Sequence, residues 1–314
     1  FPLPSGGRFR SISKSLIQPA KIVMCCPNVI EKVRQRISRR DLLKTTATAA
    51  AGVLAAGCQS TAKAKAAPAT EPISFTRVVD LSHTLHPDFP AWFVPGEEKA
   101  FGTKTFLPPA IVEVERVFKY EEIQINLNKV SYWEHVGTHM DAPNHFSEGS
   151  SVEKIPAEDL VLPLAVLDIK AKAARDPLAQ VTLEDVKAWE NKNGRIPERA
   201  CLAMNSGWAH HVNTPKFKSP NTDGAHQQPA FHIDAIKFIM EERNVVSIAV
   251  DTFSFDNLHS PEYDVHYAWL GDERWGIEVV NNLDDVPAVG ATIVVGQPKI
   301  QGGTGGPNRV MALV

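Results

Sequence analysis

The sequence predicts a mixed α/β domain with a central, partly barrel-like sheet and flanking helices. Short apolar runs rich in β-branched residues and bounded by turn residues predict strands. These runs are Arg77–Leu81, Glu122–Leu127, Val245–Val250 and Ala291–Val295. Segments with helical periodicity lie between them, and one leads directly into the apolar run at Val245–Val250. A helix followed at once by a buried strand is typical of an α/β fold.

Two helices can be placed from their end signals and periodicity. Thr182 is a suitable N-cap for a helix that runs towards Asn191, and Gly194 would end that helix. A second helix is predicted over Ile233–Arg243, because apolar residues recur there on one face. The glycine-rich run Gly302–Gly306 lacks the Lys-Ser/Thr of a phosphate-binding loop, so we expect a turn there.

The chain divides into a leader over residues 1–70 and a folded domain over residues 71–314. The leader contains the twin-arginine pattern Ser38–Lys44, followed by the apolar run Thr45–Ala56. That run is shorter than the roughly 20 residues a transmembrane helix needs, so it is interpreted as the apolar part of an export signal. The pattern predicts export by the twin-arginine route to the periplasm or cell envelope.

The end of the leader allows two forms of processing. Leu54–Cys58 resembles a lipobox, in which Cys58 would be lipidated and would form the only attachment to a membrane. Alternatively, Ala62–Ala64 would be an ordinary small-x-small cleavage site. Met24 stands a normal distance before the arginine pair, so residues 1–23 are interpreted as sequence upstream of the translated protein.

Composition and cysteine usage narrow the class of protein. The formal net charge of −3 gives no basic footprint, so nucleic acid is not an expected partner. Cys201 is the single cysteine after the leader and lies in an apolar run, which predicts a buried structural thiol. Composition therefore indicates an ordinary globular domain, and its function has to be inferred from a particular group of residues.

The segment from His135 to His145 is the candidate site. It places His135, His139, Asp141 and His145 within one short stretch. Val136, Gly137 and Thr138 disfavour a helix; in an extended chain the first three candidates would project from the same face. Two imidazoles and a carboxylate suit zinc, manganese or ferrous iron and leave open positions for water and substrate.

This segment matches the pattern H-x-G-T-H-x-D-A-P-x-H, from His135 to His145. In this respect the chain resembles the metal-dependent cyclase family, which includes kynurenine formamidases (arylformamidases) and isatin hydrolases. Asp80–Leu85 resembles the family's opening strand. His266 and Glu278 are similar to its later histidine and glutamate. The resemblance implies a swivelling β/β/α cyclase-type fold and a homodimer.

The resemblance also implies roles for these residues. His135, His139 and Asp141 would be the primary ligands of zinc or manganese, with one or two ions bound. His266 and Glu278 would complete the centre, and His145 would transfer protons. The implied reaction is hydrolysis of an aryl formamide or an isatin-like lactam through a metal-bound hydroxide, giving a carboxylate and an aryl amine.

Four further residues are predicted to contact the aromatic substrate. Trp92 and Phe93 lie in a proline-rich segment, and Trp92 looks like the aromatic residue that family members place over the substrate. Ser206 could hydrogen-bond a substrate carbonyl, and Trp208 belongs to a Ser-Gly-Trp element that is similar to isatin hydrolases.

Two other functions fit the same residues. A cyclase or dehydratase acting on a hydroxy or keto compound would use the same metal centre. A non-catalytic, envelope-anchored metal-binding lipoprotein would need the ligands but neither the proton-transfer histidine nor the aromatic residues.

Overall fold

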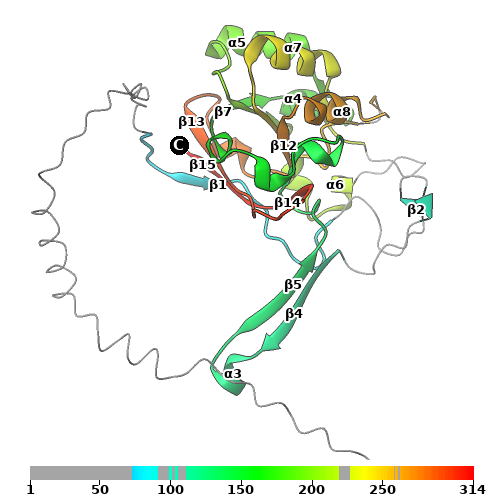
Figure 1. Ribbon diagram of the computed structural model, residues 1–314. Coiled ribbons are helices and arrows are strands. Elements are labelled where there is room, and N and C mark those ends of the chain that lie inside the picture. Colours follow the sequence, from blue (N-terminus) through cyan, green and yellow to red (C-terminus); the bar gives the residue numbers. More distant parts are fainter. Residues whose placement is uncertain are drawn as a thin grey trace, which may run out of the picture. The chain divides into compact units, whose positions relative to one another are not determined.

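The computed structural model describes residues 73–90, 99–100, 103–104, 111–218, 227–257, 259–260 and 262–314. Within these ranges nine strands form one curled, half-barrel sheet (Figure 1). In sheet order the strands are β1 Val78–Asp80, β15 Arg309–Leu313, β13 Ala291–Gly296, β7 Val161–Asp168, β9 Cys201–Asn205, β11 Ser247–Val250, β12 Trp275–Glu278, β6 His139–Asp141 and β14 Gly305–Pro307. The strands from β7 to β12 run parallel, and the other pairs are antiparallel. This architecture confirms the predicted mixed α/β fold.

The remaining elements are short sheets and helices. Three two-stranded sheets pair β8 Gln180–Val181 with β10 Ala230–Phe231, β2 Lys99–Ala100 with β3 Thr103–Lys104, and β4 Val112–Phe118 with β5 Leu127–Tyr132. The α-helices are α3 Tyr120–Ile123, α4 Lys170–Ala173, α5 Leu183–Asn193, α6 Pro215–Lys218, α7 Ile233–Arg243 and α8 Asp264–Gly271. The 3-10 helices are η1 Pro143–His145, η2 Val152–Lys154, η3 Ala157–Leu160, η4 Trp208–His211 and η5 Leu283–Asp285. No helix in the described part of the chain has the length and apolar character needed to cross a membrane.

The sheet is buried on both faces. In β9, Cys201 and Ala203 pack into one apolar cluster, whereas Leu202 and Met204 pack into another with side chains of α5, α7 and α8. This alternation follows the period of two in a strand, and burial on both sides explains why β9 is apolar from Cys201 to Met204. The prediction of a buried thiol at Cys201 is confirmed. Figure 1 shows α5 and α7 together above one face of the sheet.

Both predicted helices are confirmed. Helix α5 is capped by Thr182, whose side chain accepts from the backbone N–H of Asp185 while Asp185 accepts from the N–H of Thr182. Gly194, with φ of 89°, ends that helix. Helix α7 begins and ends at the predicted residues, Ile233 and Arg243.

One predicted element is wrong, and another is correct only in part. The strand predicted over Glu122–Leu127 is instead the tip of a hairpin: helix α3 ends at Ile123, its C-cap Gln124 is left-handed, and β5 begins only at Leu127. The run Gly302–Gly306 is not a turn throughout, because its last two residues belong to β14. A Cβ atom on Gly305 would meet the carbonyl oxygen of Met140 at 2.3 Å, so only glycine allows β14 to approach β6 this closely.

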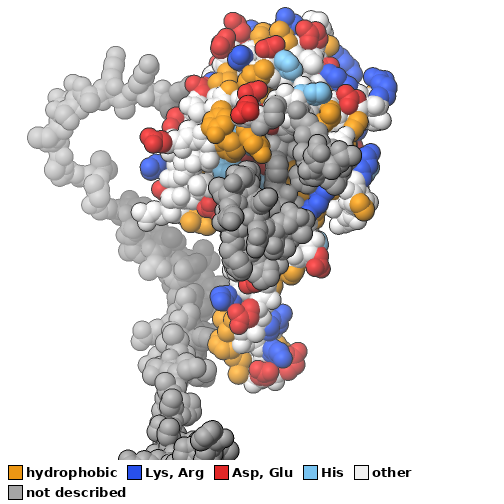
Figure 2. Space-filling view, turned by 90° about the vertical axis from the view of Figure 1, so that its right-hand side faces the viewer, with side chains coloured by type: hydrophobic (Ala, Val, Ile, Leu, Met, Phe, Trp, Pro, Cys, Tyr) orange, Lys and Arg blue, Asp and Glu red, His pale blue; other side chains and the backbone are white. Residues whose placement is uncertain are grey.

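The hairpin β4–β5 differs from the rest of the domain. Its strands pair only with each other among the described residues, and Figure 1 shows the hairpin extending beyond the sheet. Several large apolar side chains along it are about half exposed, among them Val114, Tyr120, Ile123 and Val130. Figure 2 shows apolar and charged side chains next to each other at the end of the hairpin.

Candidate metal centre

Strand β6 supplies the middle of the candidate site. His139 and Asp141 are two residues apart in β6, so their side chains leave the same face. The neighbouring strand β12 places Glu278 directly opposite His139. Helix α8 carries His266 to the same point, where its Nε2 atom lies 3.2 Å from Oε1 of Glu278 and 3.6 Å from Oδ2 of Asp141. Residues far apart in the sequence therefore meet at one buried position.

His135 reaches this position by a different route from the one predicted. The chain from His135 to Asp141 is not continuously extended, because Gly137 has φ of 65° and β6 begins only at His139. The expectation that alternation along one strand would align all three side chains is therefore wrong. The bend nevertheless brings Nδ1 of His135 to 2.7 Å from Oδ1 of Asp141.

The cluster contains buried polar atoms without hydrogen-bond partners. They are Nε2 of His139, Oδ2 of Asp141 and Oε1 of Glu278. Nε2 of His139 lies 3.3 Å from Asp141 and 3.4 Å from Glu278, but without hydrogen-bond alignment. Unpaired polar atoms in a protein interior are costly, so atoms that converge in this way require a ligand. A nitrogen and carboxylate set of this kind fits a divalent transition metal.

Each histidine of the cluster is oriented by a second contact. Nδ1 of His139 is 2.9 Å from the carbonyl oxygen of Gly137, which leaves Nε2 directed at the cluster. Nδ1 of His266 is 2.6 Å from Oδ2 of Asp256, a residue that the sequence analysis missed. Nε2 of His135 is 3.0 Å from Oγ1 of Thr304. Such outer contacts fix the tautomer and raise the basicity of a ligating imidazole.

The electrostatics of the cluster favour a cation. Burial alone would lower the pKa of His139, but the carboxylates of Asp141 and Glu278 outweigh burial and raise it to about 10. The pKa of His266 is likewise raised despite burial, through Asp141, Asp256 and Glu278. Burial opposes ionisation of Asp141, yet the surrounding histidines hold its pKa well below the usual value. The negative charge of these carboxylates is offset by protons here, and a divalent ion would replace those protons.

His145 stands beside the cluster and forms no ion pair with a carboxylate in the described part of the chain. Its ring stacks on that of His135, with centroids 3.7 Å apart and an interplanar angle of 18°. Burial lowers the pKa of His145 to about 3, so its imidazole is neutral at pH 7. A neutral imidazole next to a metal site can accept a proton.

Two overlapping groups of three side chains could each hold an ion. One consists of His139, Asp141 and Glu278, and the other of His135, Asp141 and His145. In each group the ligand atoms lie within 4.8 Å of one another, and Asp141 belongs to both. The structure thus gathers all five residues predicted to hold metal around Asp141. It also leaves His145 able to serve either as a ligand or as the proton-transfer residue.

Three aromatic rings pack around the imidazole ring of His266. The ring of Phe146 lies 4.5 Å from that of His266, and the rings of Phe255 and Tyr263 lie 4.8 Å and 5.8 Å away. None of these three was predicted to be a site residue. A signal was present for Phe146, which directly follows His145, and for Tyr263, which is three residues before His266.

The four residues predicted to contact substrate are not brought to the cluster by any described contact. Trp92 and Phe93 lie outside the described residues. The hydroxyl of Ser206 donates to Oδ1 of Asp251 at 2.5 Å, so its proton is already used within the fold. Trp208 is 2% exposed and donates from its indole nitrogen to the carbonyl oxygen of Phe217. Their roles toward substrate therefore stay predictions.

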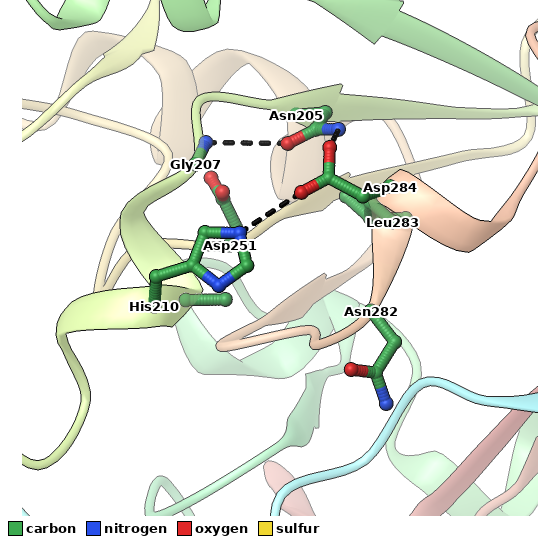
Figure 3. A pocket seen from close by; sticks show the side chains of 8 residues that line it. Asn205, Gly207, His210, Asp251, Asn282, Leu283 and Asp284 are labelled. Carbon is green, nitrogen blue, oxygen red and sulfur yellow. Dashed lines mark hydrogen bonds and ion pairs between the residues drawn. The ribbon is translucent and has the colours of Figure 1, made fainter.

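A separate small hollow lies next to Ser206. Figure 3 shows Asp284 in its wall between Asn205 and His210, with Oδ1 at 3.0 Å from Asn205 and Oδ2 at 2.9 Å from His210. Lys170 also contacts Asp284. The residues that line the hollow include none of the metal cluster, and Asp284 is fully engaged, so we assign no ligand to it.

Comparison with known proteins agrees with the geometry. Residues 79–257 match the family model described as "Putative cyclase". The chain belongs to this cyclase family. A search of curated proteins finds an isatin hydrolase of Roseibium aggregatum, 28% identical over 249 residues that cover 76% of this chain and 91% of that protein. It also finds a kynurenine formamidase of Bacillus cereus, 27% identical, covering 65% of this chain and 81% of that protein.

Solved structures show the same cyclase-family relationship. An isatin hydrolase A of Labrenzia aggregata, determined with benzyl benzoate bound, superimposes with a TM-score of 0.68. It is 34% identical, and the alignment covers 76% of this chain and 93% of that one. The family membership, the fold and the cluster together make this protein a cyclase-family hydrolase with a candidate metal centre.

Proposed function

We propose that this hydrolase cleaves the amide bond of a small aromatic substrate, either an aryl formamide or an isatin-like lactam. The observation that carries the proposal is the buried cluster around Asp141, in which atoms of His139, Asp141 and Glu278 converge without hydrogen-bond partners. A divalent ion held there would lower the pKa of a bound water and polarise the substrate carbonyl. The relatives named isatin hydrolase and kynurenine formamidase support this substrate class.

The chain's own residues would bind and orient the reacting groups. His135, His139, Asp141, His266 and Glu278 would hold zinc or manganese, while Asp256 keeps Nε2 of His266 directed inward. The rings of Phe146 and Tyr263 would flank the aromatic part of the substrate, because both lie against His266. These apolar rings would also limit the access of bulk water.

His145 would move the proton. This role rests on its position, because its ring stacks on that of His135 beside the cluster and is unprotonated at pH 7. The water oxygen joins the carbonyl carbon, the C–N bond breaks, and His145 returns the proton to the leaving nitrogen. The products would be an aryl amine, which gains one proton of the water through His145, and a carboxylic acid, which releases the other proton to solvent and becomes a carboxylate.

Turnover of isatin and of N-formylkynurenine by the metal-loaded protein tests this proposal. We expect one of them to be hydrolysed, and His139→Ala to lose turnover together with bound metal. His145→Ala should lose turnover while it keeps metal; loss of metal in this variant would make His145 a ligand instead. Stoichiometric metal without hydrolysis of either compound would contradict the substrate class and favour cyclase chemistry or metal storage.

We also propose that the protein acts as a homodimer that forms through the β4–β5 hairpin. An isolated two-stranded hairpin is marginally stable in water, and its exposed apolar side chains include Val114 and Val130, which face each other across the strands. Light scattering after size exclusion should give twice the chain mass for the wild type. Val114→Lys combined with Val130→Lys should give the monomer, whereas Ile300→Lys, at another exposed apolar position, should not.

We propose, finally, export by the twin-arginine route, with a lipid anchor at Cys58 as the alternative to a soluble mature protein. Support comes from the sequence alone, since the leader lies outside the described residues. Replacement of Arg39 and Arg40 by lysine should retain the protein in the cytoplasm. Mass spectrometry of the exported protein would distinguish a lipidated Cys58 from cleavage after Ala64.

A further inference from the structure

A strained residue follows the metal-site glutamate directly. Val279 has φ of 58°, although it is β-branched, and its side chain is 1% exposed. The left-handed region is unfavourable for any L-residue with a Cβ atom and is rare for a β-branched one. Such a conformation persists only where the surrounding structure enforces it, and it is found mostly at functional sites.

Three hydrogen bonds hold Val279 and its neighbour in place. The N–H of Val279 donates to the carbonyl oxygen of Thr252 at 3.0 Å, and that of Val280 donates to Val250 at 3.0 Å. The carbonyl oxygen of Val279 accepts from Oγ1 of Thr138 at 2.6 Å. The side chain packs in an apolar cluster with Phe89, Val136, Trp208, Phe217 and Phe253. The conformation is therefore fixed from both the backbone and the side chain.

Thr138 connects this strained residue to the opposite strand. It directly precedes His139 in β6, and Val279 directly follows Glu278 in β12. His139 and Glu278 are paired across the two strands, with 3.4 Å between Nε2 and Oε2. The Thr138 hydroxyl also accepts from the backbone N–H of His83 at 2.9 Å, so its own orientation is fixed.

From this geometry we infer that Thr138 and Val279 form a latch that sets the spacing between His139 and Glu278. In this latch the hydroxyl of Thr138 donates a hydrogen bond to the carbonyl oxygen of Val279. The left-handed conformation of Val279 ends β12, so that Glu278 stays opposite His139. Both are positioning residues, since neither has an atom among the unpartnered ligand atoms of the cluster. The inference deepens the proposed function and rests on its metal site.

The strain can be tested in metal-free protein. Val279→Ala and Val279→Gly both remove the buried side chain, but only glycine adopts a positive φ without steric cost. At an ordinary position the glycine variant would melt lower; here we expect it to melt about 2–4 °C above the alanine variant. A lower melting temperature for Val279→Gly would show that the position is not strained and would overturn the latch.

The positioning role is tested by metal affinity. We expect Thr138→Val to weaken binding of Mn²⁺ and of Zn²⁺ by about 10-fold or more, measured by competition with a chelator on protein that remains folded. Thr138→Ser keeps the hydroxyl and should stay within about threefold of the wild type. Ser247→Ala is the matched control, because it removes another buried hydroxyl, at the opposite end of β11 from the site.

The outcomes separate the latch from the proposed function. If the wild type binds metal and Thr138→Val binds it equally well, the latch is overturned while the metal site stands. If Ser247→Ala weakens binding as much as Thr138→Val does, the effect is one of general stability, and the latch is again overturned. If the wild type binds neither Mn²⁺ nor Zn²⁺, the proposed function fails and the latch with it.

Discussion

Strand β6 and the β4–β5 hairpin are close in the sequence but differ in almost every physical respect. Every residue of β6 is buried and the strand is paired on both sides, whereas the strands of the hairpin pair only with each other and are largely exposed. His139 and Asp141 in β6 depend on partners from three distant segments, α8, β12 and β14. The hairpin depends on contacts within 21 residues of sequence, 112–132. Long-range contacts position the candidate ligands, whereas among the described residues the strands of the hairpin are paired only with each other.

The largest effect should follow from changing the residue common to both groups of metal ligands. Asp141→Asn keeps the size of the side chain but removes its charge, so we expect metal affinity to fall by at least about a hundredfold, and turnover to be lost. Metal analysis of the purified variant gives the answer. Glu198→Gln, the same change on the surface, should leave metal content unchanged. Full metal occupancy in Asp141→Asn would remove Asp141 from the centre.

A smaller loss of metal affinity should follow when the substituted residue contacts a candidate ligand but would not contact the metal itself. Asp256 orients His266 through a 2.6 Å contact with Nδ1, and replacement of such a partner typically weakens metal binding 10- to 100-fold. We expect Asp256→Asn to fall in this range, measured by chelator competition. An affinity equal to that of the wild type would mean that His266 is not a ligand.

The pH dependence of metal binding should further distinguish the buried cluster at β6 from the exposed hairpin. In metal-free protein the pKa of His139 is raised to about 10, so below that pH the residue carries a proton that the metal must displace. Affinity should therefore rise by about tenfold per pH unit for each proton released, between pH 6 and 8. Calorimetry in two buffers of different ionisation enthalpy counts those protons. No proton release would contradict the raised pKa.

The smallest effect, a change in the free energy of unfolding, is expected from a substitution at the tip of the hairpin. Ile123 at its tip is 48% exposed, and Ile123→Ser should change the free energy of unfolding of the monomer by less than about 0.5 kcal/mol. Ile236 in α7 is fully buried, and Ile236→Ala should cost about 2–5 kcal/mol. Denaturant unfolding at low protein concentration measures both. Equal losses would mean that the hairpin tip is buried in solution.

The parts of the fold that were predictable are those in which local signals agree. The capping box at Thr182 and the apolar periodicity of α7 each lie within one element, and both helices were placed correctly. The strand predicted at Glu122–Leu127 failed because apolar residues there are exposed at a hairpin tip, where alternation has no core to follow. Apolar alternation predicts a strand only where the apolar residues are buried, and the sequence alone does not show which residues are buried.

The candidate site was likewise predictable where the signal is local and not where it depends on distant residues. The spacing of His135, His139 and Asp141 and a family resemblance were enough to name the residues that meet in the cluster. Asp256 was missed because nothing near it in the sequence marks it, and Thr304 was missed because the glycine-rich run that contains it was interpreted only as a turn. Thr304 is 169 residues from its partner His135, and only the pairing of β14 with β6 brings it there.

The position of β14 also has a consequence for biosynthesis. This strand, Gly305–Pro307, pairs with β6, and Thr304 just before it contacts His135. A ribosome that has made residues 135–145 has produced the signature segment, but its partners at 266, 278 and 304 have yet to emerge. The full set of candidate ligands and their contacts can therefore meet only after residue 304 has been synthesised, whereas all the residues that pair in the hairpin, 112–132, are made before the signature segment.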